Sequence, residues 1–153
     1  MHNIIKGTRN TTNEGTENTF VLGKNNTTFG ENKNSIVVGE NNEIANQINN
    51  AAVISGTYAE ATNQGEFVLG GGGFNTQVGL AQTSFIQQSG NTEDGTETLL
   101  YTQFITNKFI EKVANSVIGF EANVIGVNTG VGEGSAGDYG YVQITGAVTF
   151  TNG

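Results

Sequence analysis

Short apolar triplets recur along the first half of the chain at a nearly constant spacing. One such triplet is Ile36-Val37-Val38, which is followed by Gly39 and then by Asn41-Asn42. Gly7, Gly23 and Gly39 lie 16 residues apart. The other copies of the triplet and its closing residue are Val21-Leu22-Gly23, Val53-Ile54-Ser55 and Phe67-Val68-Leu69-Gly70. A fixed period of this size is typical of stacked coils, so we predict a β-solenoid.

Each repeat contains a strong strand, a turn, a weaker strand and a second turn. In the third repeat the strong strand is Ala52-Val53-Ile54, the weaker strand lies within Tyr58–Ala61, and the second turn is Thr62–Gly65. Glycine and asparagine suit the corners because they adopt positive φ with little strain. Stacking of these coils is expected to align asparagines of successive repeats in ladders, namely Asn25 with Asn41 and Asn26 with Asn42.

Neighbouring side chains of a triplet point to opposite faces of its strand. Alternation puts Ile36 and Val38 on one face and Val37 on the other. Because all three are apolar, we expect both faces to be covered. A single coil of about 16 residues cannot cover both, so a second chain is expected, most simply in a threefold homo-oligomer. Val37→Asp should then put a charge at an inter-coil or inter-chain contact and abolish the trimer.

The period is lost after about residue 90, and longer apolar strands follow. The run Gly70–Gly73 predicts the end of the regular stack. Beyond it, segments rich in β-branched and aromatic residues and bounded by Gly and Asn read as strands of a small antiparallel β-sandwich: 98–102, 104–105, 116–126 and 139–150. The predicted organisation is a polar N-terminal connection or frayed first coil over 1–18, the β-roll repeat region over 19–90, and the sandwich over 91–153. The sandwich is either incomplete at its C-terminus or completed by a neighbouring subunit.

The four triplet units resemble the head repeats of trimeric autotransporter adhesins and the same repeats in bacteriophage fibre proteins. The resemblance covers residues 16–75 and implies a trimeric, left-handed parallel β-roll. Ser55 departs from the family pattern, which has glycine there, although Gly56 follows at once. Residues 97–153 resemble, more weakly, a small β domain of bacteriophage tail fibres and tailspikes. Together these resemblances imply an all-β protein that forms an intertwined or side-by-side homotrimer.

Composition excludes several classes of partner. The formal net charge is −8, from 6 Lys and Arg against 14 Asp and Glu. An acidic chain lacks the basic face that nucleic acid or an anionic membrane surface requires. The sequence contains no Cys, hence no disulfide framework and no thiolate zinc site. No apolar run approaches the ~20 residues of a membrane span, and Met1-His2-Asn3 does not read as the start of a secretory signal.

Residues for catalysis are scarce. His2 is the single histidine, so a histidine base or a histidine metal cluster is not expected, and a serine nucleophile has no conventional activating partner. The carboxylates Glu93, Asp94 and Glu97 cluster between the two halves. Paired carboxylates can hydrolyse a glycosidic bond, which leaves a polysaccharide depolymerase as an alternative. We predict no catalytic residue, no cofactor and no metal.

One C-terminal loop and several aromatic residues are candidates for surface recognition. Glu133 and Asp138 share a glycine-rich loop, which is either solvated or able to bind calcium through carboxylate and carbonyl oxygens. Tyr139 and Tyr141 follow this loop, and they are either half-buried strand residues or part of a patch that recognises carbohydrate or protein. The predicted repeat core comprises Val21, Leu22, Gly23, Ile36, Val37, Val38, Gly39, Val53, Ile54, Phe67, Val68, Leu69 and Gly70.

The sequence therefore favours a structural and adhesive segment of a trimeric virion fibre, on a tail or a head. Its expected partners are two further copies of the chain, other virion proteins, and a glycan or protein of the host surface. The alternatives are the head segment of a trimeric bacterial surface adhesin and a depolymerase fragment. The expected location is the virion surface, or the bacterial surface for the adhesin.

Overall fold

The computed structural model describes residues 2–70, 77–92, 98–102, 116–129 and 135–150, and these residues are all-β with no helix among them. The chain divides into two compact units. The first comprises residues 1–89 and 100–111, and the second comprises residues 90–99 and 112–153. Each unit is described by itself below.

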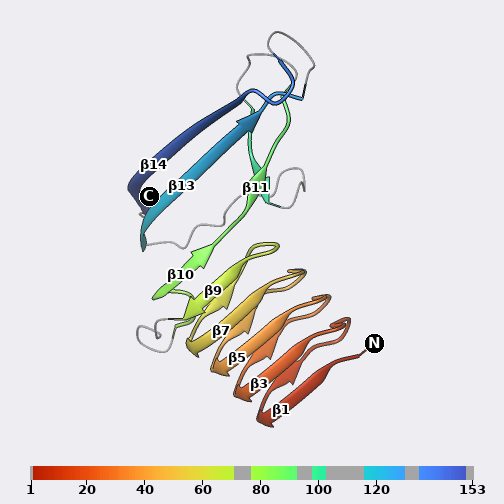
Figure 1. Ribbon diagram of the computed structural model, residues 1–153. Coiled ribbons are helices and arrows are strands. Elements are labelled where there is room, and N and C mark those ends of the chain that lie inside the picture. Colours follow the sequence, from red (N-terminus) through yellow and green to blue (C-terminus); the bar gives the residue numbers. More distant parts are fainter. Residues whose placement is uncertain (1, 71–76, 93–97, 103–115, 130–134, 151–153) are drawn as a thin grey trace. The chain divides into compact units, whose positions relative to one another are not determined.

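A six-stranded sheet forms one side of the first unit. Its strands, in spatial order, are β1 (Ile4–Thr8), β3 (Phe20–Lys24), β5 (Ile36–Glu40), β7 (Ala52–Thr57), β9 (Phe67–Gly70) and β10 (Gln82–Phe85). The first five strands run parallel, and β10 pairs antiparallel with β9. Figure 1 shows these strands side by side, with one turn of chain between successive members from β1 to β9. The predicted parallel stack is confirmed, and its regular part ends at β9, where the glycine run begins.

A second, four-stranded parallel sheet carries the weaker strand of each repeat. Its members are β2 (Thr11–Thr12), β4 (Thr27–Thr28), β6 (Glu43–Ile44) and β8 (Glu60–Ala61). The two sheets belong to a parallel β-solenoid of about four turns. Because β1 and β2 pair in register with β3 and β4, the stack begins ahead of residue 19. Of the two alternatives for residues 1–18, the pairing therefore supports a first coil.

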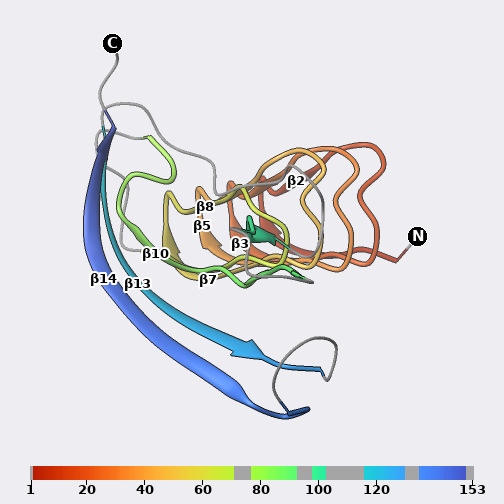
Figure 2. The same ribbon diagram turned by 90° about the horizontal axis from the view of Figure 1, so that it is seen from above.

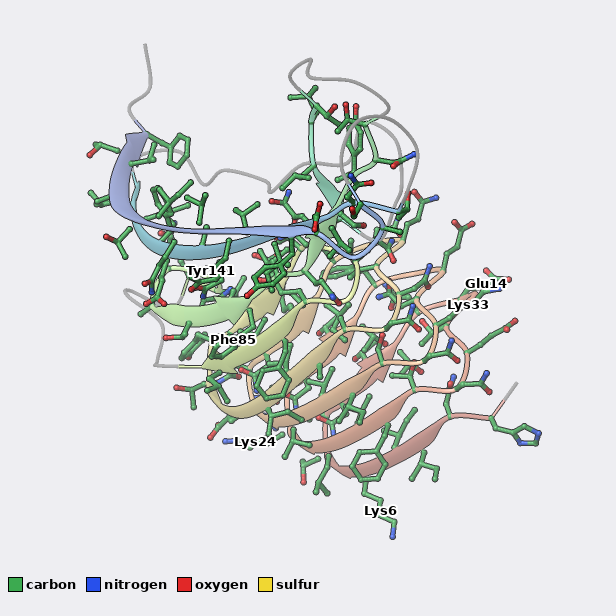
Figure 3. The ribbon with its side chains drawn as sticks, turned by 45° about the horizontal axis from the view of Figure 1, so that its top comes forward. Lys6, Glu14, Lys24, Lys33, Phe85 and Tyr141 are labelled. Carbon is green, nitrogen blue, oxygen red and sulfur yellow. The ribbon has the colours of Figure 1, made fainter. Side chains whose placement is uncertain are left out.

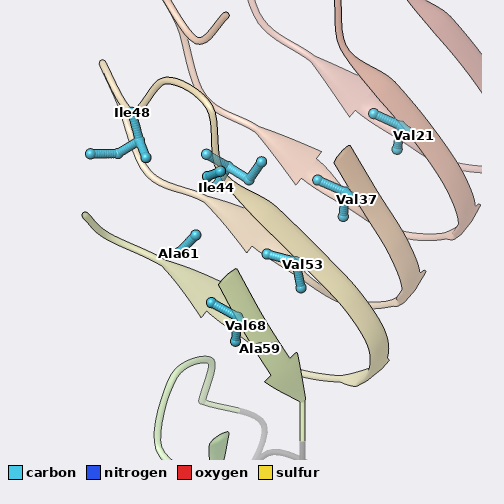
Figure 4. Close-up of a cluster of buried hydrophobic side chains, with 9 residues drawn as sticks. Val21, Val37, Ile44, Ile48, Val53, Ala59, Ala61 and Val68 are labelled. Atoms are coloured by element: carbon cyan, nitrogen blue, oxygen red, sulfur yellow. The ribbon is translucent and has the colours of Figure 1, made fainter. Parts of the chain in front are cut away.

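The coils close around a core of their own. Val21, Val37, Val53 and Val68 occupy equivalent positions in successive strands, and all are 0% exposed. Figure 4 shows them in one row, with other buried side chains nearby, among them Ile44 and Ala61 of the four-stranded sheet and Ile48 and Ala59 from outside it. Each inner valine thus lies at an inter-coil contact within a single chain.

The position of Val37 changes what the Val37→Asp substitution would test. Val37 is buried inside its own coil, whereas Ile36 on the same strand is 42% exposed. A carboxylate at Val37 would be buried among apolar side chains, so the substitution would unfold the coil itself. The inter-chain surface is tested instead by substitutions at outward positions such as Ile36.

Asparagine side chains join the coils at buried corners. The Asn26 backbone N–H donates to Asn10 Oδ1 at 3.0 Å, and the Asn42 N–H donates to Asn26 Oδ1 at 3.0 Å. The Ala59 N–H continues the series by donating to Asn42 Oδ1 at 2.9 Å. Nearer the surface, Asn25 Nδ2 donates to Asn41 Oδ1 at 3.0 Å. Both predicted ladders are therefore confirmed.

The third repeat absorbs one additional residue. The register between β5 and β7 shifts after Val38, so that Glu40 pairs with Thr57. Gly56, with φ 127°, then takes the place that Gly39, with φ 135°, holds in the preceding coil. Gly56, rather than residue 55, therefore adopts the positive φ that the repeat needs at this corner. The spacing from Gly39 to its equivalent glycine is 17 residues here instead of 16.

The second unit is built on a long antiparallel hairpin. Strand β13 (Ser116–Val127) pairs with β14 (Tyr139–Phe150) along its whole length, from Ser116↔Phe150 to Val127↔Tyr139. Figure 2 shows the pair as a curved ribbon. The two strands pair antiparallel, but the described residues form one two-stranded sheet here, so the predicted β-sandwich is not confirmed. The short pair β11 (Gln88–Ser89) and β12 (Tyr101–Thr102) belongs to the first unit.

Candidate interaction surface

The outward side of the six-stranded sheet is apolar along most of the stack. Alternation within each strand turns the residues on either side of the inner valine outward. We call this surface the outer face. One of its in-register rows is Ile4, Phe20, Ile36, Ala52 and Phe67, and the other is Lys6, Leu22, Val38 and Ile54, with Leu69 of β9 beyond it. Single exposed apolar side chains are normal on a protein surface, but a continuous row of them marks an interaction site.

The exposed fractions show that the outer face is uncovered in the single chain. Leu22 is 39% exposed, Ile36 42%, Phe67 39% and Leu69 41%. Strand β10 extends the surface, because Phe85 is 57% exposed and its ring lies 5.9 Å from that of Phe67, centroid to centroid. This aromatic pair was not foreseen in the sequence, because Phe85 joins the sheet through an antiparallel strand that breaks the repeat.

An ion pair borders the apolar rows further along the strands. Lys24 Nζ lies 2.8 Å from Glu40 Oε1, and both side chains are largely exposed. The hydrogen bond to Glu40, and after it the charge of that carboxylate, raise the pKa of Lys24. Exposed pairs of this kind contribute little to stability, so the pair serves mainly to keep the border of the outer face polar.

The hairpin presents a second apolar surface, in the other unit. By register and alternation one side of β13–β14 carries only apolar residues and glycine from Ile118 to Gly126 and on the paired residues of β14, while Ser116 lies at its end. We call it the hairpin face, and its larger members are Ile118, Phe120, Ala122, Val124, Val142, Ile144 and Val148. Gly146 leaves room on this side for the ring of Phe120, whose atoms would come within 3.0 Å of an added Cβ.

The opposite side of the hairpin is polar at its centre. Tyr141 Oη donates to Asn123 Oδ1 at 2.6 Å, and Gln143 Nε2 donates to Glu121 Oε1 at 2.8 Å. The polar side chains at the centre of this side therefore form hydrogen bonds with one another. The two sides of the hairpin therefore differ in chemistry, as expected when one side is wet and the other is covered.

The predicted recognition residues that the structure describes lie in β14 or directly before it. Asp138 Oδ2 accepts a hydrogen bond from the Ser135 backbone N–H at 2.8 Å, so this carboxylate stabilises the turn before β14. Tyr139 is 78% exposed at the start of β14. Tyr141 engages Asn123, as described above. Glu133 lies outside the described residues.

The candidate carboxylates for catalysis, Glu93, Asp94 and Glu97, also lie outside the described residues. Within the part of the chain that is described, no group of three acidic, histidine or cysteine side chains is arranged to hold a metal ion. The same part contains no helix long and apolar enough to cross a membrane. The apolar faces therefore stand out as the features of this structure that suggest an interaction.

Comparison of the chain with protein-family models, with curated proteins and with solved structures found no match.

Proposed function

We propose that the chain is a non-catalytic, structural and adhesive segment of a trimeric fibre on a virion surface. The observation that carries the proposal is the outer face, which carries apolar residues at equivalent positions of successive coils. A stack of coils provides a stiff spacer, and a continuous apolar side lets several spacers pack along their length. The resemblance of residues 16–75 to trimeric fibre and adhesin repeats supports three copies.

The hairpin supports the same arrangement independently. A two-stranded hairpin is at best marginally stable in water by itself, and it needs further strands or a covered apolar face. Three copies would bring together three hairpin faces, and their strands would supply the further layers of the predicted sandwich. In the assembled fibre this domain would contact other virion proteins or a glycan or protein of the host surface.

Light scattering of the purified chain tests the trimer. Three copies of 16.0 kDa give 3 × 16.0 = 48.0 kDa. We expect Ile36→Glu to reduce the mass to that of one chain while the coils stay folded, because position 36 is 42% exposed before assembly. Thr11→Glu, on the exposed side of the four-stranded sheet, is the matched control and should leave the mass unchanged. A wild-type mass of 16.0 kDa at micromolar concentration would refute the trimer.

Immunogold electron microscopy with antibodies against the purified chain tests the location. Label on projecting fibres of virions supports the proposal, and label on the cell envelope of uninfected bacteria supports the adhesin alternative instead.

Incubation of the chain with host surface polysaccharide tests the absence of catalysis. New reducing ends that grow with time would support the depolymerase alternative.

A further inference from the structure

The side of the hairpin opposite to the hairpin face is polar at its centre but not along its whole length. At one end, register and alternation place four aromatic or aliphatic side chains together on this side. We call them the tyrosine platform, which consists of Tyr139 and Tyr141 of β14 and their partners Val127 and Ile125 of β13. Tyr141 is labelled in Figure 3. All four side chains are between 54% and 78% exposed. A contiguous exposed group of this kind, unlike scattered single residues, points to an interaction site.

A hydrogen-bonded row of polar side chains continues directly from the platform. Tyr141 Oη donates to Asn123 Oδ1 at 2.6 Å. Glu121 Oε1 accepts from Gln143 Nε2 at 2.8 Å and, over a longer 3.5 Å, from Asn123 Nδ2. The four side chains therefore form one connected row, and the bond from the hydroxyl group fixes the orientation of the Tyr141 ring. Groups that are fixed before binding lose less conformational entropy when a ligand arrives.

The row retains acceptors that a ligand can use. Among the described residues no hydrogen bond reaches Glu121 Oε2 or the side-chain oxygen of Gln143. Tyr141 Oη donates its own proton and keeps lone pairs that accept. These acceptors suit a ligand that donates several O–H groups. A sugar does this while its apolar C–H face packs on an aromatic ring, so a ring beside a few fixed polar groups is the chemistry that recognises it.

The size of this surface favours a small ligand over a protein. The platform and the polar row together comprise seven side chains, whose members are Ile125, Val127, Tyr139, Tyr141, Glu121, Asn123 and Gln143. A stable protein–protein interface takes about 20 to 30 residues from each partner. Seven side chains are enough for the rings of a short sugar chain.

Charge selects among sugars. Glu121 and Asp138 are the charged side chains of residues 116–129 and 135–150, and both are acidic. No Lys or Arg in these two segments is available to bind the carboxylate of an acidic sugar. Such a carboxylate placed near Glu121 would be repelled by it. The charges therefore favour a neutral sugar.

We propose that this side of the hairpin binds a neutral oligosaccharide, with its rings on the tyrosine platform and its hydroxyl groups donating to Glu121 and Gln143. Tyr139 and Tyr141 lie two residues apart, about 7 Å along the strand, so one sugar chain can cover both rings. The inference rests on the proposed function in one respect, because the trimer would bury the hairpin face and leave this side in water.

Calorimetric titration of the full chain with free hexasaccharides tests the site. The neutral panel contains oligomers of glucose, galactose, mannose, rhamnose and N-acetylglucosamine. For each hexose oligomer, the form oxidised to a carboxylate at C6 is the anionic counterpart. Free oligosaccharides are used because avidity on a surface would mix binding with oligomeric state. We expect a neutral member to bind about fivefold or more tightly than its oxidised counterpart, with the difference smaller in 1 M salt and in Glu121→Gln.

Substitutions on the platform separate binding from folding. Tyr141→Ala should weaken the affinity about tenfold, because it removes the ring. Tyr141→Phe keeps the ring but loses the hydrogen bond to Asn123, so its loss should be about threefold. Val117→Ala is the matched control, since Val117 is 69% exposed on the same side at the other end of the hairpin. It should leave the affinity unchanged.

Three results would overturn the proposal: no binding by any neutral oligosaccharide, binding that Tyr141→Ala leaves unchanged, or preference for the oxidised forms. A fourth is binding to bacterial envelopes that Tyr141→Ala abolishes and that survives periodate oxidation of their sugars, which would assign this side to a protein. Light scattering of the same samples keeps the two proposals apart. A trimer that binds no sugar would refute the inference alone, and a chain of 16.0 kDa that binds would support the site and refute the trimer.

Discussion

Asn26 shows how one polar side chain holds three coils together. It is 0% exposed. Its Nδ2 donates to Asn10 Oδ1 at 3.1 Å in the preceding coil and to the Gly39 carbonyl at 2.9 Å in the following one. Its Oδ1 accepts the Asn42 N–H at 3.0 Å. A buried amide is tolerated only when its groups are paired in this way, so Asn26 stabilises the stack through satisfied hydrogen bonds.

We therefore expect Asn26→Ala to lower the free energy of unfolding by about 3 kcal/mol, because it leaves buried backbone groups without partners. Chemical denaturation measures this difference. Asn25→Gly is the matched control. It removes one ladder bond nearer the surface but keeps the positive φ of 54° that glycine also adopts, so its cost should stay below about 1 kcal/mol. Equal costs for the two variants would contradict the structural role assigned to Asn26.

Glu43 gives the first unit a pH dependence. Its carboxyl lies on the four-stranded sheet beside its register partner Glu60, and burial raises the pKa of Glu43. A raised pKa means that the folded state favours the neutral carboxyl. The associated stability is fully present below the unfolded-state pKa and is lost as the pH rises through the folded-state value.

Glu43→Gln should consequently unfold at a higher temperature than wild type at pH 7, since the amide carries no charge to desolvate. The gain should disappear below about pH 4, where the carboxyl is protonated in both folded and unfolded chains. Thermal melts across this pH range measure it. Glu14→Gln, at an exposed position, should show no such pH-dependent gain. A gain for Glu43→Gln that stays constant with pH would exclude the burial mechanism.

At the scale of the element, the repeat in the sequence predicted the coil, its two strands and the parallel register. The repeat did not show which side of each strand faces the interior of the coil. Ile36, Val37 and Val38 are all apolar, so alternation separated them into two sides without saying which side faces the core. The short strand β6 decides this, because Ile44 lies on the opposite sheet and joins the buried cluster that contains Val37.

The side chain that closes the last coil on the four-stranded sheet could not be predicted from the sequence either. There the Glu60 backbone N–H donates to Gln82 Oε1, and Gln82 Nε2 donates to the Glu60 carbonyl oxygen. Gln82 lies 22 residues beyond Glu60, outside the repeat, and a single glutamine carries no periodic signal. Likewise, Asn25 and Asn26 are neighbours of the same type, yet only Asn26 is fully buried. The corner geometry separates them, since Asn25 adopts φ 54° and turns the chain. Side-chain roles that depend on a local corner or on the end of a stack therefore could not be predicted.

The tight stacking of coils makes the glycine of the triplet indispensable. At Gly39, an added Cβ would lie 2.5 Å from Asn42 Nδ2 and would also collide with the carbonyl oxygen of Gly56, while φ is 135°. We expect Gly39→Ala to destabilise the first unit by more than about 3 kcal/mol, combining backbone strain with steric overlap.

Gly119→Ala provides the comparison, because a Cβ at Gly119 in β13 meets nothing within 4 Å. Its effect should be no more than about 1 kcal/mol, and stabilisation is the expected sign in a strand. Circular dichroism melts of both variants measure the contrast. Tolerance of alanine at Gly39 would mean that the coils are spaced more widely than the structure shows.

At the scale of the whole molecule, the two units present apolar surfaces that a single chain leaves exposed. On the hairpin face, Val142, Ile144 and Val148 range from 56% to 43% exposed. The outer face shows comparable exposure in the other unit. A monomer would keep both surfaces in water, which costs about 25 cal/mol for each Å² of apolar area left uncovered. A symmetric homotrimer would bury both surfaces in one assembly step, so its stability should rise with protein concentration.

Substitution on the hairpin face tests this coupling without touching the coils. Ile144→Lys puts a charge on the apolar side of β14, and Thr145→Lys puts the same charge on the opposite side. If the hairpin face is buried between chains, the first variant should weaken assembly by about 2 kcal/mol per chain and the second by much less. Sedimentation at several concentrations measures both. Because Ile36→Glu acts on the other unit, equal loss of assembly with Ile144→Lys and Ile36→Glu would show that both faces contribute to one oligomer. Assembly that survives Ile144→Lys unchanged would restrict the interface to the outer face and leave the hairpin face for another partner.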